Sequence, residues 1–204
     1  MKAEDCNPKD MINELAKYAE ENGATAVKIL KTIVAENEGA TQVITRKNII
    51  VGPWVRQKCQ FGCSEFGKHF NCPPFTPTHA ETSLILPCYE NAVLFEFADL
   101  SDREGQEQAR QVMLELEKRA FLAGNYKAFS YAGGPCRLCE KCVAAKIEHA
   151  TIADSRLCRH PESLRPSMES CGIDVYATVR AADLEIEVIK SRDQHFKSFA
   201  LLMF

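Results

Sequence analysis

The sequence lacks a long apolar run, because no stretch approaches the roughly 18 apolar residues that indicate a membrane-spanning helix. Its first 20 residues are charged throughout and lack the apolar core of a signal peptide. An excess of charge of one sign is also missing: the net charge is −3, which does not suit a nucleic-acid-binding surface. We therefore expect a cytoplasmic protein that binds neither membrane nor nucleic acid.

Several common enzyme motifs are absent as well. The chain has no G-x-G-x-x-G, G-x-x-x-x-G-K-[ST] or G-x-S-x-G string, which leaves nucleotide binding and serine hydrolysis without support. The C-x3-C-x2-C spacing of radical enzymes that use S-adenosylmethionine is also missing. Cys59 and Cys63 have its first interval, but Cys72 follows too late for the second. The sequence leaves open whether the protein is an enzyme.

Cysteine is the residue type present in unusual amount. Ten cysteines in 204 residues are about 5%, which is less than the roughly 8–10% typical of disulfide scaffolds. Without a secretion signal, disulfides are a poor explanation, because cytosolic reductants keep thiols reduced. Most of these cysteines fall into two short segments. Their clustering therefore predicts a metal-binding protein, with an iron–sulfur cofactor favoured.

The alternation of strand and helix patterns predicts a single domain over residues 1–204 with an α/β or α+β sandwich fold. We expect one mixed sheet with flanking helices and two cysteine-rich metal-binding loops, at 59–78 and 133–171. Helices are predicted over 8–22, 78–90 and 173–182, and between a cap at Ser101 or Asp102 and a stop at Gly124. Strands are predicted over 26–34, 43–55, 92–97, 127–131, 184–189 and 197–204.

The sharpest signal is the second cysteine group, which consists of Cys136, Cys139, Cys142 and Cys158. Its C-x2-C-x2-C run lets three thiolates wrap three corners of a cubane, and the distal cysteine completes the fourth. Gly133 and Gly134 allow close backbone approach, so that N–H groups can bond the cluster sulfides. The spacing predicts a [4Fe–4S] cluster. Structural zinc is the alternative, although zinc sites more often use two separated pairs of ligands.

The first cysteine group consists of Cys59, Cys63 and Cys72 and has the less specific C-x3-C-x8-C spacing. We predict a second cluster here, with a fourth position that no cysteine of this loop fills. The candidates for that position are Cys6, Cys88, Cys171, His69 or no protein ligand. An iron without a protein ligand can bind a substrate atom directly. Of these candidates, Cys88 suits a buried structural thiol and Cys6 suits an incidental one.

Side chains around the two groups allow more than one interpretation. Four phenylalanines of the first loop form either an apolar wall around a cluster or ordinary core: Phe61, Phe66, Phe70 and Phe75. Lys68 and His69 are candidates to donate protons near a cluster, but for His69 a place at the surface is favoured. Four arginines surround the second group, and a solvated basic face is slightly favoured over stabilisation of an anionic cluster: Arg137, Arg156, Arg159 and Arg165.

Three strings carry a family resemblance: VRQKC-QFGC-EFGK-NCPPFTPT, AGGPCRLCEKC and CRHPESLRPSMESCGIDV. Together, over about Val51 to Val188, they resemble the domain of unknown function 2284 family, whose members are described as predicted metal-binding proteins. The resemblance implies metal binding but no particular reaction. By this resemblance, the family's motif cysteines correspond to the members of the two groups defined above: Cys59, Cys63, Cys72, Cys136, Cys139, Cys142 and Cys158.

Three functions remain as hypotheses. The first is an electron-transfer or redox accessory protein with up to two [4Fe–4S] clusters, whose partner is a redox protein. The second is an enzyme whose three-cysteine cluster binds sulfur or another atom of a small-molecule substrate at an open iron. The third is a zinc-stabilised interaction module without a redox role.

Overall fold

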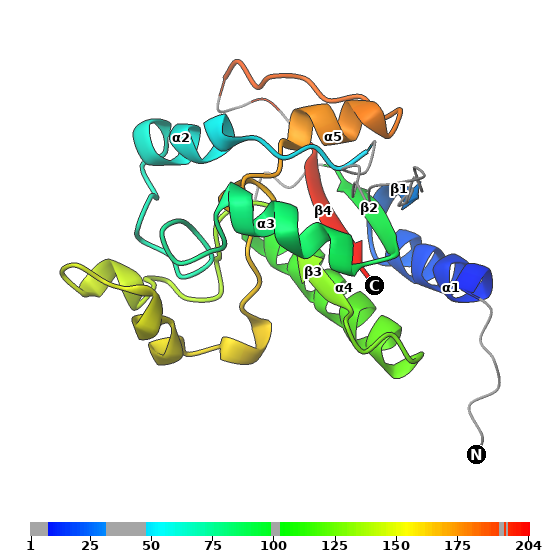
Figure 1. Ribbon diagram of the computed structural model, residues 1–204, viewed down its shortest axis with the longest axis horizontal. Helices are drawn as coiled ribbons and strands as arrows, with labels where there is room; N and C mark the ends of the chain where they lie inside the picture. Colours follow the sequence, from blue (N-terminus) through cyan, green and yellow to red (C-terminus); the bar gives the residue numbers. More distant parts are fainter. Residues whose placement is uncertain (1–7, 32–47, 99–102, 192–193, 195) are drawn as a thin grey trace, which may run out of the picture.

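The computed structural model describes residues 8–31, 48–98, 103–191, 194 and 196–204. Its strands are β1 (Ala24–Lys31), β2 (Asn91–Phe97), β3 (Phe129–Tyr131) and β4 (Ser198–Met203). They form one sheet in the order β1-β2-β4-β3, so the α+β form of the predicted fold is confirmed (Figure 1). The sheet is antiparallel rather than mixed as we expected, because β4 lies between β2 and β3 and runs opposite to both.

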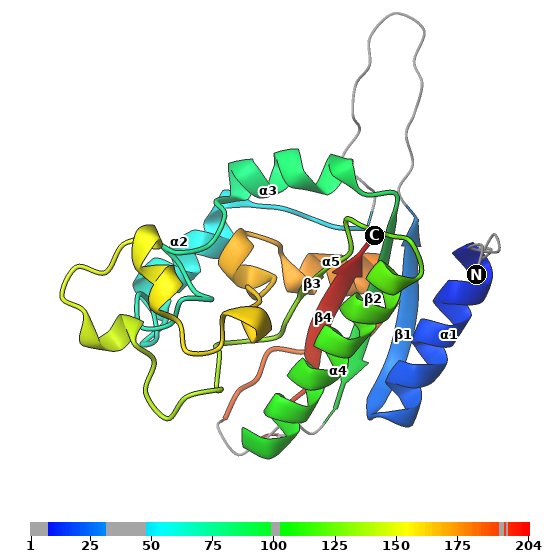
Figure 2. The same cartoon turned by 90° about the horizontal axis from the view of Figure 1, so that it is seen from below.

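The sheet separates two apolar layers. The α-helices among the described residues are α1 (Pro8–Glu21), α2 (Pro53–Gly62), α3 (His79–Ile85), α4 (Arg103–Leu122) and α5 (Val175–Ala181). Successive residues of a strand point to opposite faces. Val93 and Phe95 of β2 therefore join a core with α1 and α4, whereas Ala92 and Leu94 join a core with α5 and the segment before it. Figure 2 shows α1 and α4 on one side of the sheet, with α3 and α5 on the other.

Most of the predicted elements are confirmed, with shifted ends. The buried positions of α4 recur at helical spacing, as the apolar pattern predicted: Ala109, Val112, Met113, Leu116 and Ala120. The two capping candidates, Ser101 and Asp102, lie outside the described residues. The helix predicted over 78–90 is shorter, because α3 is followed by a 3-10 turn, Leu86–Cys88, that has a proline near its start.

Two predicted strands are wrong or incomplete. Residues 184–189 form no strand; Asp183 has a φ of +58° that turns the chain, and Leu184 and Ile186 pack against the core without joining the sheet. Of the stretch 43–55, residues 43–47 lie outside the described residues. Its end is helical rather than extended, because Pro53 is suited to the first position of α2.

The cysteine-rich segments form a lobe at the end of the molecule opposite α1 (Figures 1 and 2). Arg56 of α2 holds three parts of this lobe together. Its Nη1 donates hydrogen bonds to the carbonyl oxygens of Thr76 (3.2 Å), Pro77 (2.8 Å) and Ser170 (2.7 Å). The hydroxyl of Thr76 also donates to the Ser170 carbonyl at 2.8 Å. These bonds fix the first cysteine-rich segment against the chain that leads into α5.

Glu117 of α4 fastens the second cysteine-rich segment to the sheet. Its carboxylate accepts hydrogen bonds from Arg165 Nη2 (2.6 Å) and Nε (2.8 Å), and from the Ser130 amide (2.8 Å) and hydroxyl (2.7 Å). Burial alone would raise the pKa of this carboxyl, but the hydrogen bonds from Arg165 and Ser130 lower it. Arg165, which we expected on a basic surface, therefore forms a largely buried structural ion pair.

Replacing Arg165 with Met should lower the free energy of unfolding by about 3 kcal/mol at pH 7, because Glu117 is left buried without its cation. A carboxylate with a lowered folded pKa stabilises the fold above the ordinary glutamate pKa of about 4.3, and this contribution is lost as the pH falls through the folded pKa. The difference in the free energy of unfolding between Arg165→Met and the unchanged protein, measured by urea denaturation, should therefore shrink below about pH 4. The exposed Arg159→Met is the control, and an equal loss in both variants would refute the ion-pair role.

Candidate metal centre

The first cysteine group lies around the end of α2. Cys59 occupies the last turn of the helix, and Cys63 follows the last helical residue, Gly62. A spacing of four residues places the two side chains on one side of a helix end. The loop predicted over 59–78 is thus corrected, because its first residues belong to α2.

Cys72 joins this pair from the loop before α3. Burial, together with the charges of Cys63 and Cys59, raises the pKa of the Cys72 thiol to about 12. Burial also raises the pKa of Cys59, with further contributions from Glu169 and Cys63. The three thiols are thus close enough to sense one another's charge. With these raised pKa values the partly buried thiols of Cys59 and Cys72 are protonated at neutral pH, so a metal ion must displace protons to bind them.

A carboxyl group that the sequence analysis missed lies beside these thiols. The charge of Glu169, in the 3-10 turn Glu169–Cys171, raises the pKa of both Cys59 and Cys72. Its Oε2 atom is buried and has no hydrogen-bond partner. Burial raises the pKa of the carboxyl, and this effect exceeds the lowering by hydrogen bonds from its own amide and from Ser167. An unsatisfied buried acceptor costs about 1–3 kcal/mol. The sequence signal was an acidic residue two positions before Cys171 in the string SMESCG.

The second cysteine group lies in a segment whose only helices among the described residues are short 3-10 turns. Burial raises the pKa of the thiols of Cys136 and Cys158. Backbone amides oppose this effect, since the Leu138 amide donates to the Cys136 sulfur and the His160 amide to the Cys158 sulfur. The charges of Cys139 and Cys142 influence both thiols. The structure therefore brings these four predicted ligands into one neighbourhood, with N–H groups turned to sulfur.

Asn71 joins the two cysteine groups. Its side chain is 1% exposed; Oδ1 accepts a hydrogen bond from the Cys136 amide at 2.9 Å, and Nδ2 donates to the Gly134 carbonyl at 3.1 Å. The thiol of the neighbouring Cys72 senses the charge of Cys136. The two groups, which are 64 positions apart at these cysteines (136 − 72), are therefore adjacent in space.

The phenylalanines of the first loop differ in their burial. Phe70 and Phe75 are buried in an edge-to-face contact with ring centroids 5.2 Å apart. They pack in a small apolar cluster with Cys142 and Cys158. These two rings fill a core that touches the predicted ligands, so the core interpretation is confirmed, and an apolar wall around a cluster stays a prediction. Phe61, by contrast, is 78% exposed at the end of α2 and forms no wall.

His69 is buried rather than at the surface as expected. Its Nε2 lies 2.8 Å from Glu65 Oε2, and its Nδ1 is buried without a hydrogen-bond partner. The expectation was wrong because the loop folds over the ring and supplies its own carboxylate. His69 remains a candidate ligand.

The other cysteines proposed for the fourth position differ in their surroundings. Cys171 lies wholly within the core behind the sheet, and burial raises the pKa of its thiol to about 12. Cys88 is exposed rather than buried as expected, and its thiol donates weakly to the Leu84 carbonyl at 3.7 Å. Cys6 lies outside the described residues.

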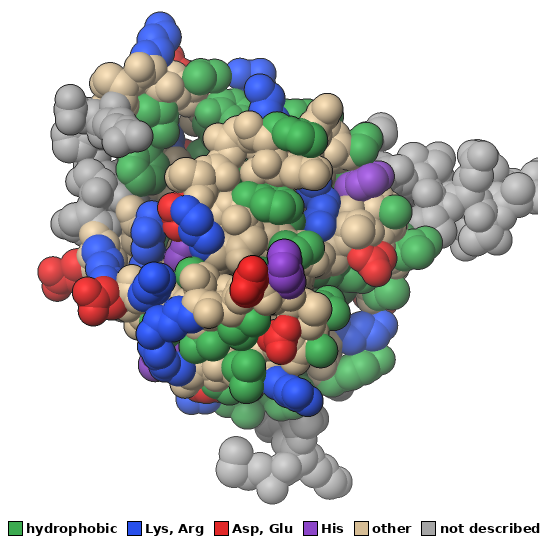
Figure 3. Space-filling model, turned by 90° about the vertical axis from the view of Figure 1, so that its left-hand side faces the viewer, with side chains coloured by type: hydrophobic (Ala, Val, Ile, Leu, Met, Phe, Trp, Pro, Cys, Tyr) green, Lys and Arg blue, Asp and Glu red, His purple; other side chains and the backbone are tan. Residues whose placement is uncertain are grey.

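Positive charge gathers on one side of the lobe (Figure 3). Arg137, Arg156 and Arg159 are exposed, as expected for a solvated basic face. Figure 3 shows Lys and Arg side chains gathered along one side of this surface. A buried arginine that the sequence analysis did not weigh, Arg110 of α4, lowers the pKa of the Cys136 thiol.

The donors fit a thiolate-binding metal or cluster in kind. Cysteine thiolates select zinc, copper(I) and iron–sulfur clusters, and the unpartnered oxygen of Glu169 offers one further donor beside the first group. Within the described part of the chain, no three His, Cys, Asp or Glu side chains are gathered tightly enough to enclose one metal ion. Binding a single ion would therefore require side chains to move.

The comparisons agree with these donors. The chain matches the family model described as predicted metal-binding protein (DUF2284) over residues 42–204 and belongs to that family. No curated protein and no solved structure matches the chain. In the part of the chain that the structure describes, no helix has the length and apolar character needed to cross a membrane.

Proposed function

We propose that this protein carries two adjacent [4Fe–4S] clusters and serves intracellular electron transfer as a redox accessory protein. Cys136, Cys139, Cys142 and Cys158 would hold one cluster, and Cys59, Cys63 and Cys72 the other. The observation that supports this proposal most is the hydrogen bonding of Asn71, which connects the loop of Cys72 to the backbone of Gly134 and Cys136. Clusters supply and accept single electrons, and closeness is what electron exchange between them requires.

The contiguous cysteine run favours clusters over zinc. A tetrahedral zinc bound at 2.3 Å by thiolates brings the sulfurs to about 3.8 Å from one another. In a cubane each cysteine binds a different iron, so the sulfurs stand further apart. The unbroken run of Cys136, Cys139 and Cys142, together with amide groups donating to sulfur, supports the cluster assignment.

An enzymatic role is the second candidate, and Glu169 favours it. The first group offers three thiols, and the unpartnered Oε2 of Glu169 lies near two of them. We propose that this carboxylate occupies the fourth iron position. An oxygen ligand is exchanged more readily than a thiolate, so a substrate atom can displace it.

Glu169→Gln tests this ligand role. The variant should lose the first cluster faster on exposure to air, with the iron content falling from about eight to about four per chain, while the second cluster stays. Absorbance and iron analysis follow the loss. Glu162→Gln, an exposed change in the same lobe, is the control. Retention of both clusters by Glu169→Gln at the rate of the unchanged protein would exclude the carboxylate as a ligand.

Metal and sulfide analysis of anaerobically purified protein tests the cluster assignment itself. We expect about eight irons and about eight acid-labile sulfides per chain, with a brown colour that bleaches on reduction. Stoichiometric zinc without sulfide would contradict the proposal and support the zinc-stabilised interaction module instead.

A further inference from the structure

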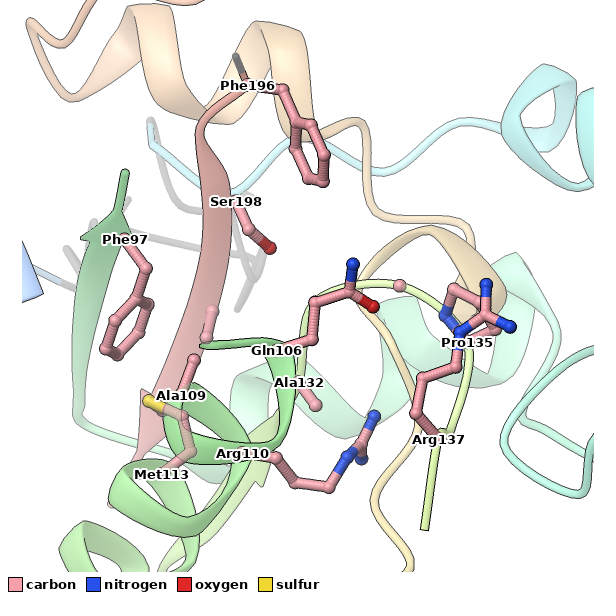
Figure 4. Close-up of a pocket in the computed structure, with 13 residues that line it drawn as sticks. Phe97, Gln106, Ala109, Arg110, Met113, Ala132, Pro135, Arg137, Phe196 and Ser198 are labelled. Atoms are coloured by element: carbon pink, nitrogen blue, oxygen red, sulfur yellow. The ribbon is translucent and has the colours of Figure 1, made fainter. Parts of the chain in front are cut away.

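A cavity of about 200 Å³ lies beside the second cysteine group, between α4, the sheet and the turn at 133–135 (Figure 4). Its wall depends on a close backbone approach, because a Cβ atom on Gly133 would collide with the hydroxyl of Ser198 on β4. An apolar cavity of about 150 Å³ holds a benzene molecule. The space therefore suits a small organic ligand.

One side of the cavity carries a buried cation. Arg110 is 5% exposed, and its Nη1 has no hydrogen-bond partner. Figure 4 shows its guanidinium extending from α4 toward the turn, with Arg137 on the same side of the cavity. Glu107, one turn earlier on α4, does not line the cavity; its Oε1 accepts a hydrogen bond from Gln111, and its Oε2, like Arg110 Nη1, is buried without a hydrogen-bond partner. A buried charge normally has a partner. Because Arg110 Nη1 has none, an acceptor group of a ligand can be its partner.

The opposite side of the cavity is largely apolar, although the hydroxyl of Ser198 also lines it (Figure 4). Phe97, Met113 and Phe196 line it, and none of the described lining residues is Asp or Glu. A guanidinium pairs with a carboxylate through two parallel hydrogen bonds. Inorganic phosphate would need donors all round. Gln106, Arg137 and Ser198 supply some besides Arg110, but Phe97, Met113 and Phe196 would leave other phosphate oxygens against apolar side chains.

We propose that this cavity binds a small organic carboxylate, whose charged end pairs with Arg110 and whose apolar body lies against Phe97, Met113 and Phe196. A neighbouring cavity shares Gln106 and Arg137 with this one and reaches Cys139. The ligand would therefore lie next to the second cysteine group. The inference does not depend on which metal the cysteines hold.

Calorimetric titration of the anaerobically purified protein with benzoate, butanoate and inorganic phosphate tests the proposal. The two carboxylates should bind, and phosphate should bind at least 10-fold more weakly. Arg110→Met should weaken benzoate binding by about 10- to 100-fold, the effect of losing a charge-assisted pair. Arg119→Met, an exposed arginine of the same helix, should leave the benzoate affinity unchanged.

A second variant keeps the test decisive if Arg110→Met folds poorly. Ala109→Leu fills the cavity from α4 while Arg110 stays, and it should abolish benzoate binding. Failure of benzoate to bind, equal binding of phosphate, or unchanged affinity in a folded Arg110→Met protein would each overturn the proposal. Loss of iron in Arg110→Met without any benzoate binding to the unchanged protein would show that Arg110 serves the cysteine group alone. Iron and sulfide content, measured on the same samples, separates these outcomes from failure of the cluster assignment.

Discussion

Cys139→Ser should remove about four irons and about four sulfides per chain, because Cys139 is the middle ligand of the second group and its loss breaks the contiguous cysteine run that wraps three corners of the cubane. The remaining iron should belong to the first cluster, whose ligands lie in a different loop. Iron and sulfide analysis of anaerobically purified protein gives the numbers. The control is Cys88→Ser, which changes an exposed thiol that belongs to neither group. It should keep the iron bound by the second group.

Retention of full iron and sulfide by Cys139→Ser would refute the assignment of the second group. Loss of all iron would show that the two groups hold a single shared centre or depend on each other for folding. Either result would change the interpretation of Asn71, whose bonds to Gly134 and Cys136 couple the two segments in the structure.

Removing the metal should loosen the cysteine lobe while the sheet and its helices persist. Residues 136–171 contain only 3-10 turns as helices, and the apolar cluster that joins the two loops is small. We therefore expect metal binding to contribute to the folding of this lobe. Chelation should lower Tm by at least about 10 °C, the shift expected when ~4 kcal/mol is lost from a chain of this size.

Limited proteolysis locates the change. Cleavage of the chelated protein should concentrate at 59–78 and 133–171, whereas α4, which packs against the sheet, should stay protected. Metal-free protein that resists protease as well as the loaded form does would show that the lobe folds without metal.

The periodic elements could be predicted from the sequence because their patterns are local. The apolar face of α4 and the dense apolar run of β2 each carry their own signal over many residues. The direction of the strands carries no such signal, since the place of β4 between β2 and β3 depends on contacts far apart in the chain. The strand predicted at 184–189 failed for the same reason: Leu184 and Ile186 pack against the core, but the segment pairs with none of the described strands.

The predicted cysteines were visible in their spacing, but their surroundings were not. Nothing local in the sequence shows that Asn71 bonds to Cys136, or that Glu169 lies beside Cys59 and Cys72, because these contacts join distant segments. Burial of His69 was equally hidden. Only the fold shows which polar atoms are left without partners, and these atoms extend the candidate site beyond the cysteines.

The closeness of the two clusters is the central claim, and electron paramagnetic resonance of the fully reduced protein tests it most directly. A reduced [4Fe–4S] cluster carries unpaired electron spin, so two neighbouring reduced clusters interact magnetically. We expect a signal of about two spins per chain that is broadened or split, and that becomes a narrow signal of about one spin in Cys139→Ser. Two sharp, independent signals in the reduced protein, or zinc in place of iron with no signal at all, would contradict the account.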